Sequence, residues 1–96
     1  MLIWTEPAVK DVMEFIAISK PDTENTVKKY FLKLANYIEI LDVMPYLGKK
    51  FPLFFNNLHI REIIFKSHKI FYQIRGSNIY ILAVLHCKMD TRYHFI

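Results

Sequence analysis

The sequence predicts a single α+β domain with the element order β-α-α-β-β-β. An N-terminal strand and a helical hairpin are expected to pack on a small, mainly antiparallel sheet. Two patterns support this class: the first half has apolar residues at helical spacing, and the second half has three short β-branched runs separated by polar turns. The length of 96 residues suits one core, so we expect residues 1–96 to form one domain.

The first strand is expected at residues 1–5, a short apolar segment followed by Glu6 and Pro7. Thr5 or Glu6 can begin a helix here, because proline is well tolerated in a first helical turn. Four apolar residues then share one helix face, which we expect to be buried against the sheet: Val9, Val12, Met13 and Ile16.

A second helix is predicted from Glu24 to about Met44. The segment 19–22 breaks the first helix, and Asp22 or Thr23 can cap the second. The two helices therefore form an αα-hairpin, and Pro45 ends it. Apolar residues recur along the second helix at alternating spacings of four and three: Val27, Phe31, Leu34, Ile38 and Leu41.

The remaining chain predicts a loop and then a three-stranded meander. Residues 49–57 are predicted as loop because Pro52 and the Asn56–Asn57 pair interrupt an apolar segment. The last run is β-branched and largely apolar, so it is expected to be central and buried on both faces. The polar turns at 66–69 and 76–78 separate the three expected strands, which are Leu58–Phe65, Ile70–Arg75 and Ile79–His86.

Charge is distributed unevenly along the chain. Residues 1–42 carry five Lys or Arg against seven acids, a net charge of −2. Residues 43–96 carry eight against two, a net charge of +6, together with all four histidines. A basic half attracts polyanions such as nucleic acid or an acidic protein segment, although an ordinary solvated surface is the alternative explanation.

Several classes of protein are excluded by simple counts. Cys87 is the only cysteine, so no intrachain disulfide and no Cys/His zinc pattern are expected. The longest apolar run, residues 79–85, is far shorter than the ~20 residues that a membrane span needs. The N-terminus does not resemble a signal peptide. We therefore expect a cytoplasmic protein without membrane contact, metal or cofactor.

The ordered set of motifs resembles the RelE/ParE superfamily of toxins from type II toxin–antitoxin systems. The resemblance covers nearly the whole chain, and the segment from Ile79 to His86 is its most telling part. The motifs are Leu47-Gly48 after the long helix, Arg61-Glu62 on a strand, Ile70-Phe71-Tyr72-Gln73-Ile74, the turn, Ile79-Tyr80-Ile81-Leu82-Ala83-Val84-Leu85-His86, and Asp90.

The resemblance implies a toxin that is neutralised in a hetero-oligomer by a cognate antitoxin. We expect the antitoxin to carry an acidic, amphipathic C-terminal segment. ParE-like members inhibit DNA gyrase without covalent chemistry of their own, whereas RelE-like members cleave mRNA on the ribosome. The Leu85-His86 pair with Asp90 resembles the ParE-like branch. Gln73 and Met89 stand where the superfamily commonly has arginine, which weakens a nuclease interpretation.

The residue types needed for RNA cleavage are nevertheless present. Cleavage needs groups that move protons and cations that stabilise the phosphate charge. If the chain is a nuclease, the catalytic candidates are Arg61, His86, Tyr93 and His94. The alternatives are a structural role for His86 and a frayed terminus for Tyr93 and His94.

Two further sets of residues are candidates for binding. Basic residues of the predicted sheet could contact the target, whether gyrase or ribosome: Lys66, Lys69, Arg75 and Lys88. Apolar residues of the loop before the sheet could contact the antitoxin, or could instead fill the core: Phe51, Leu53, Phe54 and Phe55. A small basic binding module without toxicity remains a third functional class.

Overall fold

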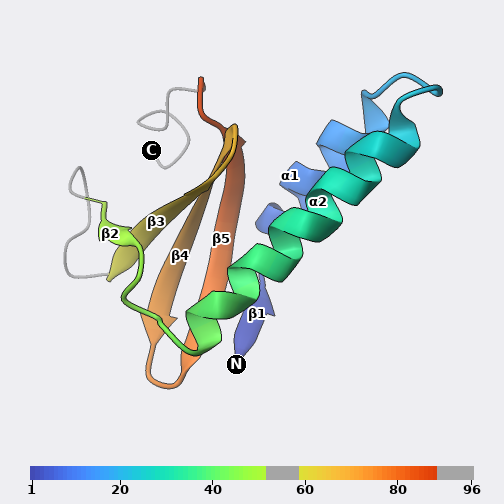
Figure 1. Cartoon of the computed structure of the whole chain (residues 1–96). Coiled ribbons are helices and arrows are strands. Elements are labelled where there is room, and N and C mark those ends of the chain that lie inside the picture. The colour runs from blue at the N-terminus through green and yellow to red at the C-terminus, as the bar shows by residue number, and fades with distance from the viewer. Residues whose placement is uncertain (52–58, 89–96) are drawn as a thin grey trace.

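The computed structural model describes residues 1–51 and 59–88. Figure 1 shows a twisted sheet with a pair of helices lying across one of its faces. The elements in chain order are β1 (Leu2–Trp4), α1 (Glu6–Ala17), α2 (Glu24–Ile38), the 3-10 helix η1 (Glu39–Asp42), β2 (Lys49–Lys50), β3 (Ile60–Phe65), β4 (His68–Arg75) and β5 (Asn78–His86).

The five strands form one sheet in the order β1-β5-β4-β3-β2. Strand β1 pairs in parallel with β5, and every other neighbouring pair is antiparallel. The chain therefore enters the sheet at β1, crosses through the helical hairpin, and returns to build the meander from the far edge inwards. This arrangement confirms the predicted α+β class and adds one short strand, β2.

Thr5 joins β1 to α1. Its side-chain Oγ1 accepts a hydrogen bond from the backbone N–H of Ala8 at 3.4 Å, which caps the helix as expected. The same hydroxyl donates to the carbonyl of Ile81 at 2.7 Å, and the backbone N–H of Thr5 donates to that carbonyl at 3.1 Å. The start of α1 is thereby tied to β5.

The second helix is shorter than predicted. The prediction of one continuous helix to about Met44 is wrong beyond Ile38, where the backbone tightens into η1. A short 3-10 turn is common at the C-terminus of an α-helix, and Pro45 disfavours the α conformation at Met44, so the helix does not continue to Met44. Leu41 lies in η1 and is still fully buried, as the apolar spacing predicted.

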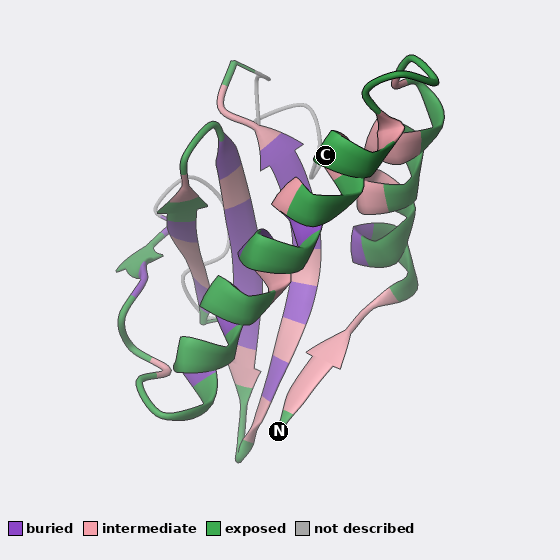
Figure 2. Cartoon of the chain, turned by 45° about the vertical axis from the view of Figure 1, so that its right-hand side comes forward, coloured by how far each residue is buried: buried purple, intermediate pink, exposed green. Residues whose placement is uncertain are grey.

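The core consists of two clusters, one on each face of the sheet. Neighbouring residues of β4 point to opposite faces, so Ile70 and Tyr72 belong to one cluster and Phe71 to the other. Figure 2 shows the buried positions concentrated on the strands. The cluster beneath the helices contains Ala8, Phe31, Leu34, Ile38, Leu41, Ile63, Ile70, Tyr72, Ile79, Ile81 and Val84.

The second cluster contains Phe51, Ile60, Phe71, Ala83 and Leu85. Strand β5 lies between β1 and β4 and contributes to both clusters, which confirms the prediction of a central strand buried on both faces.

The apolar face of α1 is only partly buried, contrary to expectation. Val12 and Ile16 pack against the core, but Val9 is 44% exposed and Met13 is 57% exposed. Ala8 is the only fully buried residue of the helix. The stripe was correctly located on one face, but the sheet covers only part of it, because α1 also turns this face toward α2.

Strand β2 replaces part of the predicted loop. Lys49 pairs with Glu62 and Lys50 with Arg61, and the backbone N–H of Phe51 donates to the carbonyl of Ile60 at 3.0 Å. The adjoining meander also differs slightly from the prediction, since β4 begins at His68, two residues before the expected start.

The outer edge of β5 is partly covered by α1. Strand β1 pairs only with residues 79–81. Beyond this pairing, the backbone N–H of Val84 donates to the carboxylate Oδ2 of Asp11 at 3.0 Å. A helix side chain thus takes the place of a strand at this point of the edge.

Candidate functional site

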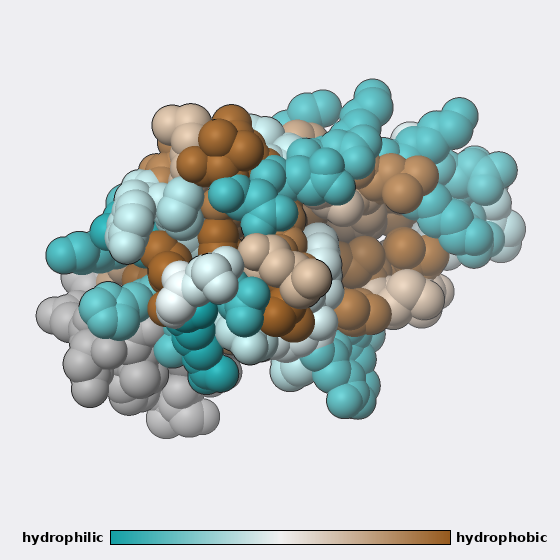
Figure 3. Space-filling model, turned by 90° about the horizontal axis from the view of Figure 1, so that it is seen from below, coloured by the Kyte–Doolittle hydropathy of each residue, from teal (hydrophilic) through white to brown (hydrophobic). Residues whose placement is uncertain are grey.

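A hydrophobic groove of about 450 Å³ lies between α1 and α2. Its most exposed apolar members are Met13, at 57%, and Leu32, at 65%. Figure 3 shows hydrophobic side chains lining a hollow on the half of the molecule that carries the helices. The residues around the groove are Trp4, Val9, Val12, Met13, Ile16, Lys28, Phe31, Leu32 and Ala35.

The groove exists because the two helices leave an apolar seam between them at the surface. Phe31 closes the bottom of the seam and is only 6% exposed, whereas Leu32, one residue later, stands on the rim. Lys28 provides a charged rim and is paired with Glu24 at 3.2 Å, one helical turn earlier. An apolar depression with a polar rim is the form that a protein-binding surface takes.

Tyr72 anchors the segment between η1 and β2. Its buried hydroxyl donates to the carbonyl of Pro45 at 2.8 Å and accepts from the backbone N–H of Gly48 at 2.8 Å. Burial raises the pKa of Tyr72 above its usual value, although the Gly48 hydrogen bond and the nearby Arg61 act in the opposite direction. A Cβ at position 48 would lie 2.6 Å from the Tyr72 hydroxyl, so only glycine fits there.

Arg61 holds the other side of this segment. Its Nη1 donates to the carbonyl of Gly48 at 2.7 Å, and its guanidinium stacks on the Tyr46 ring at 5.0 Å from the centroid. Arg61 also lines a second pocket, of about 340 Å³, at the end of the sheet near the β4–β5 turn. The other residues around this pocket are Tyr46, Lys50, Phe51, His59, Ile60, Ile74 and Gly76.

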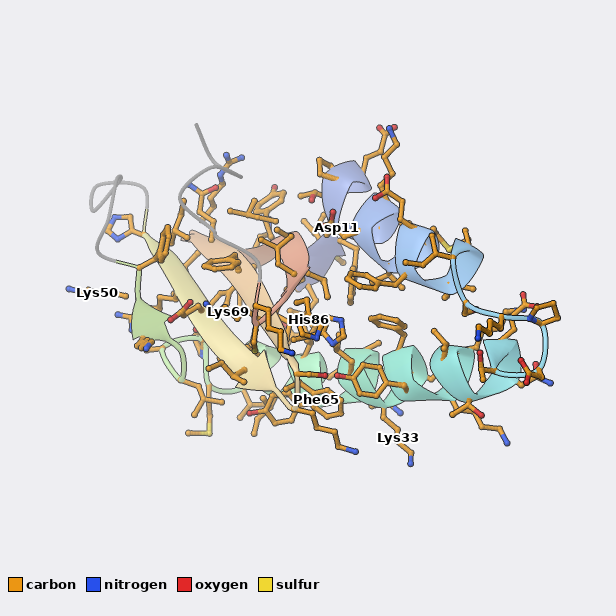
Figure 4. The ribbon with its side chains drawn as sticks, turned by 90° about the horizontal axis from the view of Figure 1, so that it is seen from above. Asp11, Lys33, Lys50, Phe65, Lys69 and His86 are labelled. Atoms are coloured by element: carbon orange, nitrogen blue, oxygen red, sulfur yellow. The ribbon has the colours of Figure 1, made fainter. Side chains whose placement is uncertain are left out.

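His68 and His86 face each other beneath the helical hairpin, with ring centroids 5.5 Å apart. The Nδ1 of His68 lies 2.8 Å from the Tyr30 hydroxyl, while its buried Nε2 has no hydrogen-bond partner in the described part of the chain. Burial lowers the pKa of His68, and the neighbouring His86 lowers it further. Figure 4 shows His86 pointing into the space between the sheet and the helices.

The catalytic candidates are not brought together in the described structure. Arg61 pairs with Tyr72 and His86 with His68, so the two candidates are separated by four residues along β4. At a rise of ~3.3 Å per residue this amounts to roughly 13 Å along the strand, and the Arg61 guanidinium is held against Gly48 and Tyr46 while the His86 ring lies against His68. Tyr93 and His94 lie outside the described residues.

The basic candidates for target binding fall at two ends of the sheet. The N–H of Cys87 donates to the carbonyl of Ser67 at 2.8 Å. Lys66 precedes Ser67 and Lys88 follows Cys87, so both lysines lie at the same end of the sheet. Lys69 pairs with Leu85 and therefore lies on the face away from the helices. Arg75 lies at the opposite end of β4.

Arg75 is also held by its neighbours. Its Nε donates to the Oε1 of Gln73 at 2.9 Å, and its guanidinium lies over the Tyr80 ring at 4.9 Å from the centroid. Gln73, which departs from the superfamily pattern, is thus a buried acceptor for this arginine. Met89, the second departure, lies outside the described residues.

Of the four loop residues suggested as antitoxin contacts, only Phe51 is described. It is 7% exposed and packs edge-on against Phe71, with centroids 5.0 Å apart, which supports the core-filling alternative. Leu53, Phe54 and Phe55 lie outside the described residues. Neither Met13 nor Leu32 was predicted as a binding residue. Helical periodicity assigned Met13 to a buried face, and Leu32 lies outside the predicted apolar stripes, although both are exposed beside the groove.

Neither a metal site nor a membrane-spanning helix is found within residues 1–51 and 59–88. No group of three or more His, Cys, Asp or Glu side chains is arranged to hold a metal ion there. None of the helices in that part is long and apolar enough to cross a membrane.

The comparisons with known proteins agree on one group. The model of the family described as the ParE toxin of type II toxin–antitoxin system, parDE, matches residues 2–91. No curated protein matches the chain in sequence.

Two solved structures are similar in fold. The chromosomal ParDE system from P. aeruginosa is matched with a TM-score of 0.70 and 15% identity, over 91% of this chain and 95% of that chain. The isolated E. coli RelE toxin is matched with a TM-score of 0.52 and 15% identity, over 99% and 92%. At such identities these two likenesses concern the fold alone.

Proposed function

The chain belongs to the ParE toxin family of type II toxin–antitoxin systems, and from this premise we propose that it inhibits DNA gyrase and is neutralised by a cognate antitoxin in the cytoplasm. The observation that carries the proposal is the family match over residues 2–91. A gyrase inhibitor acts by binding and needs no catalytic group of its own.

The arrangement of the polar residues supports inhibition over RNA cleavage. Metal-free cleavage needs a cation and a proton-transferring group within reach of the same phosphate. Arg61 is engaged by Gly48 and Tyr46, and His86 lies near the other end of the sheet against His68. Arg61 and His86, the two described catalytic candidates, are therefore not assembled into one nuclease site.

We place the antitoxin on the groove between α1 and α2. An amphipathic segment can insert apolar anchors beside Met13 and Leu32, which are exposed in the free chain. Lys28 on the rim can pair with an acid of the same segment. Further acids of the antitoxin would meet the basic second half of the chain, which carries a net charge of +6.

A supercoiling assay tests the inhibition. The purified chain is added to gyrase and relaxed plasmid, and we expect supercoiling to be lost and cleaved DNA to accumulate. Prior addition of the antitoxin encoded beside the gene should restore supercoiling. Full gyrase activity at a large excess of folded toxin would refute the proposal.

The alternative target is the ribosome. A RelE-like endoribonuclease would produce new transcript ends inside translated codons within minutes of induction, and His86→Ala would abolish them. Gyrase poisoning would instead give an SOS response and filamentation with intact transcripts. Mapping transcript ends and DNA damage in one induced culture separates the two, and a harmless chain would point to a small basic binding module.

The proposed antitoxin surface has its own test. Leu32→Asp places a charge in the groove, and we expect it to weaken antitoxin binding by at least tenfold, since interface anchors of this kind contribute ~2 kcal/mol or more. Asn36→Asp is a matched control, because it adds the same charge at an exposed position of the same helix that does not line the groove. Equal affinity of the two variants for the antitoxin would show that the antitoxin does not bind in this groove.

A further inference from the structure

We propose that the pocket at the β4–β5 turn end of the sheet binds a phosphate group of a nucleic acid or nucleotide through Lys50, His59 and Arg61. The inference goes beyond gyrase inhibition, because it assigns a ligand to a pocket for which the family match states no role and which shares no residue with the proposed antitoxin groove. The pocket has a volume of about 340 Å³ and is lined by all three of these side chains.

The first supporting observation is a like-charge pair. Lys50 and Arg61 stand directly opposite each other on the antiparallel strands β2 and β3. Like charges at such positions repel and destabilise the pairing. The neighbouring pair is the reverse case, since Lys49 and Glu62 are opposite charges with a 3.2 Å ion pair. A bound anion would remove the repulsion at Lys50 and Arg61.

The second observation is that the pocket retains unused donors. The Lys50 ammonium and the His59 imidazole make no hydrogen bond or ion pair with any side chain or backbone group in the described ranges 1–51 and 59–88. Arg61 uses only Nη1, for the carbonyls of Tyr46 and Gly48, so Nε and Nη2 remain available within those ranges. A guanidinium fixed in this way keeps its remaining N–H groups in one orientation, which lowers the entropy cost of binding.

The third observation concerns access. Figure 4 shows Lys50 reaching outward from β2 at the margin of the molecule, and Lys50 is exposed to solvent. His59 lies at the start of β3 with a φ of 55°, a left-handed conformation that carries its side chain out of the regular strand pattern. The side chains of Lys50, His59 and Arg61 therefore line one pocket from β2 and from the start of β3.

The geometry favours phosphate over carboxylate. A phosphate group has several oxygens, which can accept charge-assisted hydrogen bonds from donors on different sides at the same time, whereas a carboxylate has two oxygens in one plane. Tyr46 adds an aromatic surface that is 68% exposed, next to which a base or sugar can pack. Both candidate targets, gyrase on its DNA and the ribosome on its mRNA, present such groups.

Fluorescence anisotropy with the purified chain tests the inference. The probes are a labelled 12-nucleotide single-stranded DNA and an RNA of the same sequence, with AMP as competitor. We expect Lys50→Ala to weaken oligonucleotide binding about tenfold, as loss of one charge-assisted contact does, and to lower the salt dependence by roughly 0.7 in the log–log slope. Displacement of the oligonucleotide by AMP would show that the pocket binds a single nucleotide. Failure of AMP to displace it would show that binding requires the phosphates of a nucleic-acid strand.

A matched control and a second variant complete the design. Lys33→Ala removes the same charge from the outer face of α2, where Figure 4 shows Lys33 pointing away from the sheet, and we expect less than a twofold effect there. His59→Asn keeps a residue that tolerates positive φ and should weaken binding several-fold.

Two outcomes would overturn the inference. The first is equal oligonucleotide affinity for the Lys50 and Lys33 variants. The second is displacement of the oligonucleotide by a polyglutamate peptide as readily as by unlabelled DNA, which would assign the pocket to an acidic protein segment. Neither outcome depends on gyrase, so failure here is distinguishable from failure of the proposed function.

Discussion

Two leucines on α2 represent two differently built regions of the molecule. Leu34 is fully buried between the helices and the sheet, whereas Leu32, two positions earlier, is 65% exposed on the rim of the groove. The same side chain on the same helix is a core residue in one case and an unfilled contact in the other. The sheet side of the hairpin is thus packed in the isolated chain, whereas the groove side is left open, and it is there that we propose the antitoxin binds.

The comparison separates stability from binding. Residues of the sheet side are expected to determine whether the chain folds, and residues of the groove side to determine what it binds. This division would be contradicted if substitutions on the sheet side changed mainly binding, or if substitutions on the groove side changed mainly stability.

The largest expected effect is the loss of core packing in Leu34→Ala. Truncating a fully buried leucine costs ~2–5 kcal/mol of unfolding free energy, because the transfer energy is lost and a cavity remains. Leu32→Ala on the same helix should change the unfolding free energy by less than ~0.5 kcal/mol. Urea denaturation of both variants measures the difference, and similar losses for the two would show that the groove is part of the core.

The next effect is expected at Tyr72. Tyr72→Phe removes the hydroxyl that accepts from the Gly48 N–H and donates to the Pro45 carbonyl. The unfolding free energy should fall by ~1–3 kcal/mol, because the buried Gly48 N–H is left without a partner. Tyr37→Phe, at an exposed position on α2, is the control. A Tyr72→Phe variant as stable as the parent chain would mean that water replaces the hydroxyl.

A smaller effect, confined to acidic pH, is expected at His68. Burial lowers its pKa in the folded state below the ordinary value of 6.5, so the unfolded chain takes up the proton first. The unfolding free energy should therefore be unaffected above about pH 6.5 and decline as the pH falls below it.

His68→Gln tests this pH dependence. Glutamine can still bond to the Tyr30 hydroxyl but cannot titrate, so the variant should lose stability less steeply than the parent chain between pH 7 and pH 5. Thermal denaturation across this range gives both slopes. Parallel slopes would assign the acid sensitivity to groups other than His68.

The smallest effect concerns the rim of the groove. Lys28→Ala removes the exposed ion pair with Glu24, and the expected loss of unfolding free energy is ~0.3–0.5 kcal/mol. Antitoxin affinity should nevertheless fall measurably, because Lys28 lines the groove. A stability loss above 1 kcal/mol with unchanged antitoxin affinity would reverse the division between the two regions.

The sequence predicted the elements whose patterns are local. Alternating spacings of four and three correctly located Phe31, Leu34 and Leu41 in the core, and the β-branched run at Ile79 correctly identified the central strand. Thr5 was correctly identified as one of two possible helix starts.

The features that depend on contacts between distant segments could not be predicted. Strand β2 has only two residues and exists because Lys49 and Lys50 pair with β3. The opposition of Lys50 and Arg61, which creates the proposed phosphate pocket, follows from that register alone. The exposure of Met13 depends on how far α1 leans from the sheet, and helical spacing carries no information on this tilt.

The carboxylate of Asp11 has a consequence for the chain in isolation. Strand β5 continues past β1, and an uncovered strand edge is a template on which further copies can add in register and aggregate. Asp11 occupies the N–H of Val84 and sets a negative charge against this edge, which disfavours edge-to-edge pairing with another copy. We therefore expect Asp11 to oppose self-association of the chain whenever no partner is bound to it.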